Sequence, residues 1–149
     1  MTLEVGDIFI WDNFPYPITG EIKRRWFVYF GDDGTFGIYV YIFTTTTNFN
    51  MQDEDSILFK KGEYNFIEDC ILNIGIDGYS KILTKEDIEK YINNGDIKKK
   101  SKLTENKIRE IYNKVLKSKR LSRRIKMLIH DALNRYGIIG LKTPPTRKK

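Results

Sequence analysis

The sequence predicts a mainly β fold, a small antiparallel sheet that curls into a barrel, with helices at its C-terminal end. Three observations support this fold class. The chain has 149 residues, which fits one domain of ordinary size. Its first half holds short runs of aromatic and β-branched residues separated by turn residues. Its second half has apolar residues at helical spacing. We therefore expect residues 1–80 to form the barrel and residues 81–149 to form a helical extension packed on it, within the same domain.

The expected strands follow one another closely. Each is a run of aromatic and β-branched residues that ends at glycine, proline, aspartate or asparagine, the residues that favour turns. Connections this short favour antiparallel pairing, because parallel strands need a long crossover. The strong candidates are residues 5–11, 25–30 and 36–43, and weaker ones are residues 56–60, 64–67 and 70–74.

Three helices are predicted from their capping residues. Thr84, Thr104 and Ser122 each have the side-chain oxygen that accepts a hydrogen bond at a helix start, and Gly137 suits the end of the third helix. Apolar residues after each cap recur on one face. These residues are Ile88, Tyr91 and Ile92 in the first helix, Ile108, Ile111, Tyr112 and Val115 in the second, and Ile125, Leu128, Ile129, Ala132 and Leu133 in the third.

The net charge of +6 conceals an uneven distribution. Residues 1–90 contain eight Lys or Arg and sixteen Asp or Glu, a net charge of −8, and residues 91–149 carry +14. A segment as basic as the second is typical of proteins that bind a polyanion or an acidic protein, and equally of solvated helix faces.

Several classes of protein are excluded by composition. The single cysteine, Cys70, cannot form an internal disulfide, and together with the single histidine, His130, it cannot make a Cys/His zinc site. No apolar run approaches the ~20 residues of a membrane span, and the start lacks the features of a signal peptide. We expect a cytoplasmic protein without membrane contact, metal or cofactor. His130 lacks a serine, cysteine or acid at a catalytic spacing, so a structural role is expected for it.

A cation and a hydroxyl are predicted to meet at the open end of one hairpin. Arg24 and Arg25 begin the second strand, and residues 44–47, four threonines, close the third. If these strands pair through the turn at residues 31–34, Arg25 and Thr44 lie at the same end. Arginine binds two phosphate oxygens in a planar fork, and a threonine hydroxyl can donate to a third. The pattern suits a phosphodiester, while an ordinary edge arginine beside β-prone threonines is equally compatible with the residues alone.

At these residues the chain resembles the MazF/PemK family, the ribonuclease toxins of bacterial type II toxin–antitoxin modules. The family's motifs occur in the same order over about residues 4–75, and the C-terminal half is only loosely similar. Two departures stand out, because Trp26 replaces the proline that follows the family's arginine, and Thr44, Thr45 and Thr46 all fit the family's threonine. The matching residues are Gly6-Asp7, Asp12 with Pro15, Gly20-Glu21, Arg25 and Thr44.

The resemblance implies an SH3-like β-barrel of MazF/PemK-like and CcdB-like architecture that acts as a sequence-selective, metal-independent endoribonuclease. It also implies a homodimer that an antitoxin protein holds inactive. The RNA 2′-hydroxyl would be the nucleophile, with Arg25 and Thr44 as catalytic residues. Because a guanidinium stays protonated, Arg25 is expected to clamp the phosphate or to give a proton to the leaving oxygen. The residues expected to bind single-stranded RNA are Lys23, Arg24, Thr46, Phe14, Tyr16, Lys119, Arg120 and Arg124. The two aromatic rings would stack on bases, and packing against the barrel is equally compatible with them.

Two other functions stay open on the sequence. One is a non-catalytic SH3-like module that binds nucleic acid or protein. A barrel with a net charge of −8 is a poor surface for RNA, and this charge favours the module over a nuclease. The other is an interaction protein whose basic segment recognises the acidic tail of an antitoxin.

Overall fold

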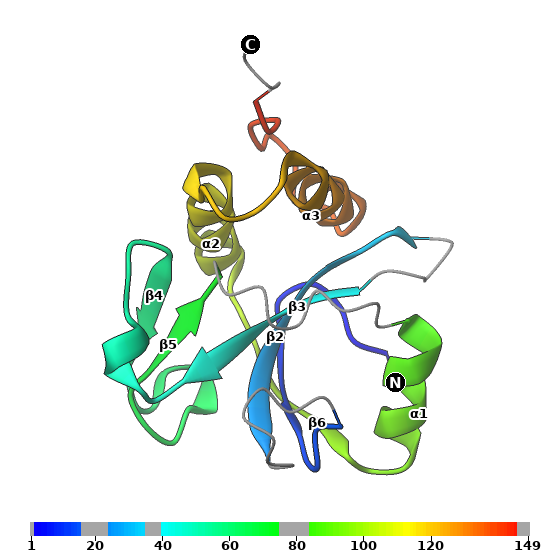
Figure 1. The fold of residues 1–149 in the computed structure, drawn as a ribbon. Coiled ribbons are helices and arrows are strands. Elements are labelled where there is room, and N and C mark those ends of the chain that lie inside the picture. Colours follow the sequence, from blue (N-terminus) through cyan, green and yellow to red (C-terminus); the bar gives the residue numbers. More distant parts are fainter. Residues whose placement is uncertain (1, 16–23, 35–39, 75–83, 146–149) are drawn as a thin grey trace.

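The computed structural model describes residues 2–15, 24–34, 40–74 and 84–145, which form an antiparallel sheet with three helices (Figure 1). The predicted antiparallel sheet with C-terminal helices is therefore confirmed. The strands are β1 (Asp7–Trp11), β2 (Arg25–Asp32), β3 (Val40–Thr46), β4 (Ser56–Phe59), β5 (Cys70–Asn73) and β6 (Ile97–Lys102). The helices are α1 (Lys85–Asn93), α2 (Glu105–Lys117) and α3 (Arg123–Arg135), with short 3-10 turns η2 (Phe49–Met51) and η3 (Glu63–Asn65).

The strands lie in the order β4-β5-β3-β2-β1-β6. Strand β3 belongs to both halves of the sheet, because its first part pairs with β2 up to Thr44 and its last residues, Thr45 and Thr46, pair with β5. Within the described residues, no pairing joins the edge strands β4 and β6. Instead the amide of Asn65 in η3 donates to the carbonyl of Lys100 in β6 at 3.0 Å. The 3-10 turn, and not a strand ladder, connects the two edges.

The six strands differ from the expected set at two places. The segment expected as a strand at residues 64–67 instead begins with η3, because Tyr64 and Asn65 have positive φ angles of 49° and 68° that interrupt an extended chain. Strand β6 was not expected, and it pairs with β1 although it lies beyond residue 80. Of the expected third strand, residues 40–43 are in β3, and residues 36–39 lie outside the described part of the chain.

Three helices begin where the sequence predicts. The hydroxyls of Thr84, Thr104 and Ser122 each accept a hydrogen bond from a backbone N–H three residues later. Helix α3 lies against β2 at Gly31, where an added Cβ would come within 3.3 Å of Leu128. The close approach therefore favours glycine, because any side chain at this position would push the end of Leu128 aside by a few tenths of an ångström. No helix within the described ranges combines the length and the apolar character that crossing a membrane demands.

Candidate functional site

The pairing of β2 with β3 places Arg25 and Thr44 on the same face of the sheet. Phe27 lies directly opposite Thr44. Arg25 lies two residues before the first residue of β2 that pairs with β3, and the pairing of β2 with β1 shows no register shift between Arg25 and Phe27. Side chains alternate between faces along a strand, so residues 25 and 27 share the face of Thr44. Arg25 and Thr44 are thus diagonal neighbours, a relation in which Cα atoms lie about 7–8 Å apart.

Arg25 has a buried donor that lacks an acceptor. It lies opposite Trp11 of β1, and both the Arg25 Nε and the Trp11 Nε1 are shielded from solvent without a hydrogen-bond partner among the described residues. Leaving a buried donor unpaired costs about 1–3 kcal/mol, so such groups usually face a ligand, an ion or water. The Thr44 hydroxyl donates to the carbonyl of Thr45 over a long 3.3 Å, which leaves it available for a better acceptor. The three groups suit an anionic oxygen.

Arg24 is exposed and shares a carboxylate with Lys98. Its Nε lies 2.5 Å from Asp12 Oδ1, and Lys98 Nζ lies 3.4 Å from Asp12 Oδ2. The hydrogen bond from Arg24 is the main reason that the pKa of Asp12 falls below its usual 3.8. Asp12 therefore stays ionised and its two oxygens are already bound to cations.

Two other predicted RNA contacts have local roles here. Phe14 is buried at 1% exposure, with its ring centroid 4.9 Å from that of Trp11 and 4.8 Å from that of Phe27. This ring belongs to the core, which corrects the expectation that it stacks on a base. The Thr46 hydroxyl accepts a hydrogen bond from the backbone of Asn48 and stabilises a turn. Tyr16 and Lys23 lie outside the described residues.

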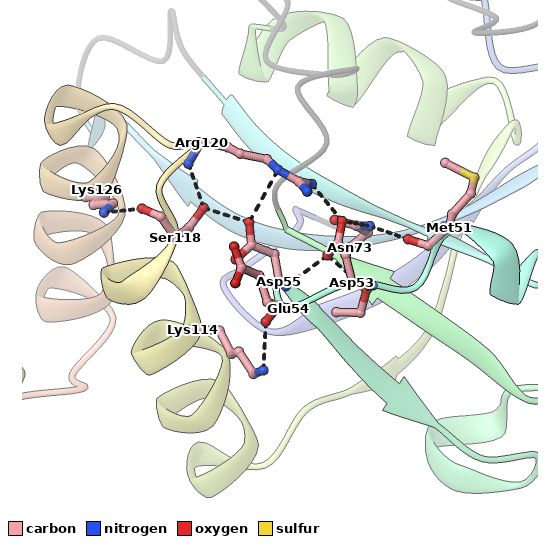
Figure 2. Close-up of polar contacts among 10 residues, drawn as sticks. Met51, Asp53, Glu54, Asp55, Asn73, Lys114, Ser118, Arg120 and Lys126 are labelled. Carbon is pink, nitrogen blue, oxygen red and sulfur yellow. Dashed lines mark hydrogen bonds and ion pairs between the residues drawn. The ribbon is translucent and has the colours of Figure 1, made fainter.

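Residues 117–124, between α2 and α3, form a basic elbow that carries Lys117, Lys119, Arg120, Arg123 and Arg124. It is anchored to the acidic loop at residues 53–55 (Figure 2). Arg120 Nη1 lies 2.8 Å from Asp53 Oδ2, and the Ser118 hydroxyl donates to Asp55 Oδ2 at 3.0 Å. Asp55 and Ser118 are both buried. We call these four residues the elbow latch. All three elbow residues expected to bind RNA, Lys119, Arg120 and Arg124, are exposed, and Arg120 differs in that it is held by an ion pair to the acidic loop.

Sequence reasoning missed a buried acid at the end of β2. The carboxylate of Asp32, 1% exposed, accepts hydrogen bonds from the Tyr29 hydroxyl at 2.7 Å and the Tyr136 hydroxyl at 3.3 Å. Arg135 at 3.3 Å and Lys85 at 3.5 Å complete the group. The only signal in the sequence is an aspartate between Gly31 and Asp33, a pattern that predicts a plain turn. We call these five residues the Asp32 cluster.

The cysteine and the histidine show no sign of activation. Burial raises the pKa of the Cys70 thiol to about 12, so it carries almost no thiolate near neutral pH. His130 Nδ1 lies 3.0 Å from Asp131 Oδ1, and its ring centroid lies 6.2 Å from that of Tyr112. Neither residue has the surroundings that make a catalytic nucleophile or base.

Compared with models of known protein families and with curated protein sequences, the chain matches none of them. Its function is therefore inferred from its own residues and their geometry.

Proposed function

We propose that the protein is a metal-independent endoribonuclease of the MazF/PemK kind that cleaves single-stranded RNA at Arg25 and Thr44. The supporting observation is the buried Arg25 Nε, which has no acceptor among the described residues and shares a sheet face with Thr44. A phosphodiester supplies the anionic oxygens that these donors lack.

As the finer fold we propose an SH3-like barrel. Strand β3 supports it, because one continuous strand pairs with β2 at one end and with β5 at the other, as a strongly curled sheet requires. The contacts of η3 also support it, since Asn65 binds Lys100 of the edge strand β6 and Tyr64 binds Thr104 at the start of α2.

The proposed reaction uses the RNA's own 2′-hydroxyl. Its oxygen bonds to phosphorus while the bond from phosphorus to the 5′-oxygen breaks, which leaves a 2′,3′-cyclic phosphate and a 5′-hydroxyl. The 2′-hydroxyl gives its proton to water, and the leaving 5′-oxygen takes one up. Arg25 holds two phosphate oxygens as negative charge grows on them, and Thr44 donates to one of them. DNA lacks the nucleophile and is not cut.

The second candidate is a non-catalytic module that binds RNA at the same residues. The environment of Asp12 favours it, because this carboxylate near Arg25 is held by Arg24 and Lys98 and is not free to act as a base. The two functions predict the same binding site and differ only in cleavage.

As protein partners we propose an antitoxin and a second copy of the chain. Apolar side chains beside the edge strand β4 support a protein contact, since Leu58 is 42% exposed and Ile67 is 69% exposed. The +14 segment at residues 91–149 would suit an acidic antitoxin.

The test is RNA cleavage by the purified protein in EDTA. The wild type should release fragments that end in a 2′,3′-cyclic phosphate, and Arg25→Ala should release none while melting like the wild type. Arg109→Ala removes a half-buried arginine that pairs with Glu105 in α2 and serves as the matched control, with cleavage unchanged. Cleavage retained by Arg25→Ala would contradict the site. Binding by the wild type without any cleavage would identify the non-catalytic module.

A further inference from the structure

Strand β6 carries lysines of the basic half of the chain to the edge of the sheet beside the candidate site. Ile97 of β6 lies opposite Trp11, and Trp11 lies opposite Arg25, so the three residues form one row across β6, β1 and β2. Neighbouring strands are about 4.8 Å apart, which puts the backbone of β6 about 10 Å from that of Arg25. The sheet is therefore less acidic than the net charge of −8 over residues 1–90 indicates, because it also includes β6, which carries four lysines.

Two of these lysines neutralise a buried acid. Asp7 is fully buried, and Lys99 Nζ and Lys102 Nζ lie 3.1 Å and 3.8 Å from its Oδ1. A buried carboxylate needs such partners, so the charges of Lys99 and Lys102 serve the fold.

The other two lysines leave positive charge in excess. Lys98 is 56% exposed and shares Asp12 with Arg24, which is 62% exposed, so two cations meet one carboxylate. Lys100 is exposed, and its ammonium has no acidic partner in the part of the chain that the structure describes. Only its backbone carbonyl is bonded, to Asn65.

Arg24, Lys98 and an aromatic ring lie on one side of the sheet. Asp12 binds both cations, so both side chains reach the same side. Trp26 and Lys98 both lie opposite Ile10 of β1, so they share one face of the sheet, the face opposite to that of Arg25. Its half-buried ring has its centroid 5.1 Å from that of Phe66. Cations beside an indole are the usual elements of a surface that binds single-stranded nucleic acid.

We propose that single-stranded RNA passes from the Arg25 site round the first residues of β2 to the opposite face of the sheet, where Arg24, Lys98 and Lys100 bind it, with a base against Trp26. This inference rests on the proposed function and names the surface that holds its substrate. The elbow is the less suitable surface, because Lys117 and Lys119 line a cavity of about 370 Å³ in which, with Lys114, three lysines face three acids, Glu54, Asp55 and Glu110.

The experiment measures binding apart from cleavage. A fluorescent 2′-O-methyl RNA lacks the nucleophile and stays intact, so its dissociation constant can be followed from 50 to 200 mM salt. Each phosphate contact on a single strand contributes about 0.7 to the slope of log affinity against log salt. Lys98→Gln/Lys100→Gln should lower the slope by about 1.4, so that across this range the wild type loses roughly sevenfold more affinity than the variant. Lys117→Gln/Lys119→Gln removes the same charge from the elbow and should keep the wild-type slope.

Each result has one meaning. The predicted difference between the two variants, with both melting like the wild type, supports the β6 surface. A wild-type slope in the β6 variant, a lowered slope in the elbow variant, or no RNA binding by the wild type overturns it. Cleavage is scored separately on unmodified RNA, so a wild type that binds through β6 but does not cut would refute only the nuclease proposal.

Discussion

The Asp32 cluster allows a quantitative test of what joins the sheet to the helices. Asp32→Asn keeps the shape of the side chain and removes its charge. The amide oxygen can still accept from the backbone N–H of Gly34, which lies 2.8 Å from Asp32 Oδ1, and from Arg135. The amide nitrogen then replaces the oxygen that accepts from Tyr29 and Tyr136. The variant therefore loses charged hydrogen bonds without leaving a cavity.

The expected loss follows from those bonds. Hydrogen bonds to a charged group contribute about 1.5–3 kcal/mol and neutral ones about 0.5–1.5 kcal/mol. The neutral amide of the variant avoids the free-energy cost of burying a charged carboxylate, and this gain offsets part of the loss in hydrogen-bond energy. We expect a loss of about 2 kcal/mol in the free energy of unfolding, which for a domain of this size lowers Tm by about 4–8 °C.

The dependence on pH gives a second readout. Burial raises the pKa of Asp32, but the hydrogen bonds from Tyr29 and Gly34 and the charges of Lys85 and Arg135 more than compensate and hold it below 3.8. A lowered pKa in the folded state stabilises the protein above the unfolded pKa of about 3.9, and this stabilisation is lost as pH falls through the folded value. The difference between wild type and Asp32→Asn should thus be full at pH 7 and shrink below about pH 4.

Urea unfolding followed by tryptophan fluorescence at pH 7, 5 and 3 measures both effects. Glu68→Gln removes the same charge from an exposed position and should stay within about 0.5 kcal/mol of the wild type. If Asp32→Asn were as stable as the wild type at pH 7, the charge of Asp32 would not stabilise the junction of β2 with α1 and α3.

Two further predictions concern the site and the elbow latch. Thr44→Val keeps the side-chain shape and removes the hydroxyl, so cleavage should fall at least about tenfold, the equivalent of one charged hydrogen bond of about 1.5–3 kcal/mol. Thr45 points to the opposite face, so Thr45→Val should cleave RNA at the wild-type rate. An equal loss of cleavage in both variants would contradict the assignment of the site to the face of Thr44. Ser118→Ala removes the hydroxyl that donates to the buried Asp55, so thermal melting should show a loss of about 1.5–3 kcal/mol in the free energy of unfolding. Ser101→Ala, a half-exposed serine in β6, should melt like the wild type, and equal melting of both variants would show that the latch adds no stability.

The sequence was sufficient where local signals decide the structure. The caps at Thr84, Thr104 and Ser122 need only a side-chain oxygen and the next turn of helix, and all three were predicted. The alignment of Arg25 with Thr44 needs only a hairpin and the alternation of side chains. Both arguments involve residues that are close together in the chain.

The missed features depend on residues that are distant in the chain. Strand β6 reads as a run of lysines, and the acid that Lys98 binds, Asp12, lies 86 residues earlier. Ser118 and Asp55 are 63 residues apart in the chain, so neither the elbow latch nor the role of Arg120 could be predicted from the sequence of the basic elbow alone. Phe14 follows Asn13, whose φ of 54° marks a turn, and the sequence did not show that its ring packs in the core.

The pairing of β1 with β6 also sets the order in which the protein can fold during synthesis. Strand β1 leaves the ribosome early, but the strand that covers its outer edge ends only at Lys102. Until then Asp7 lacks the two lysines that neutralise it, and β1 presents an unpaired edge to other chains. Contacts of such long sequence separation slow folding, because the intervening loop must be ordered first. The nascent chain is therefore most exposed to aggregation between the synthesis of β3 and that of β6, the interval in which binding by a chaperone would help it most.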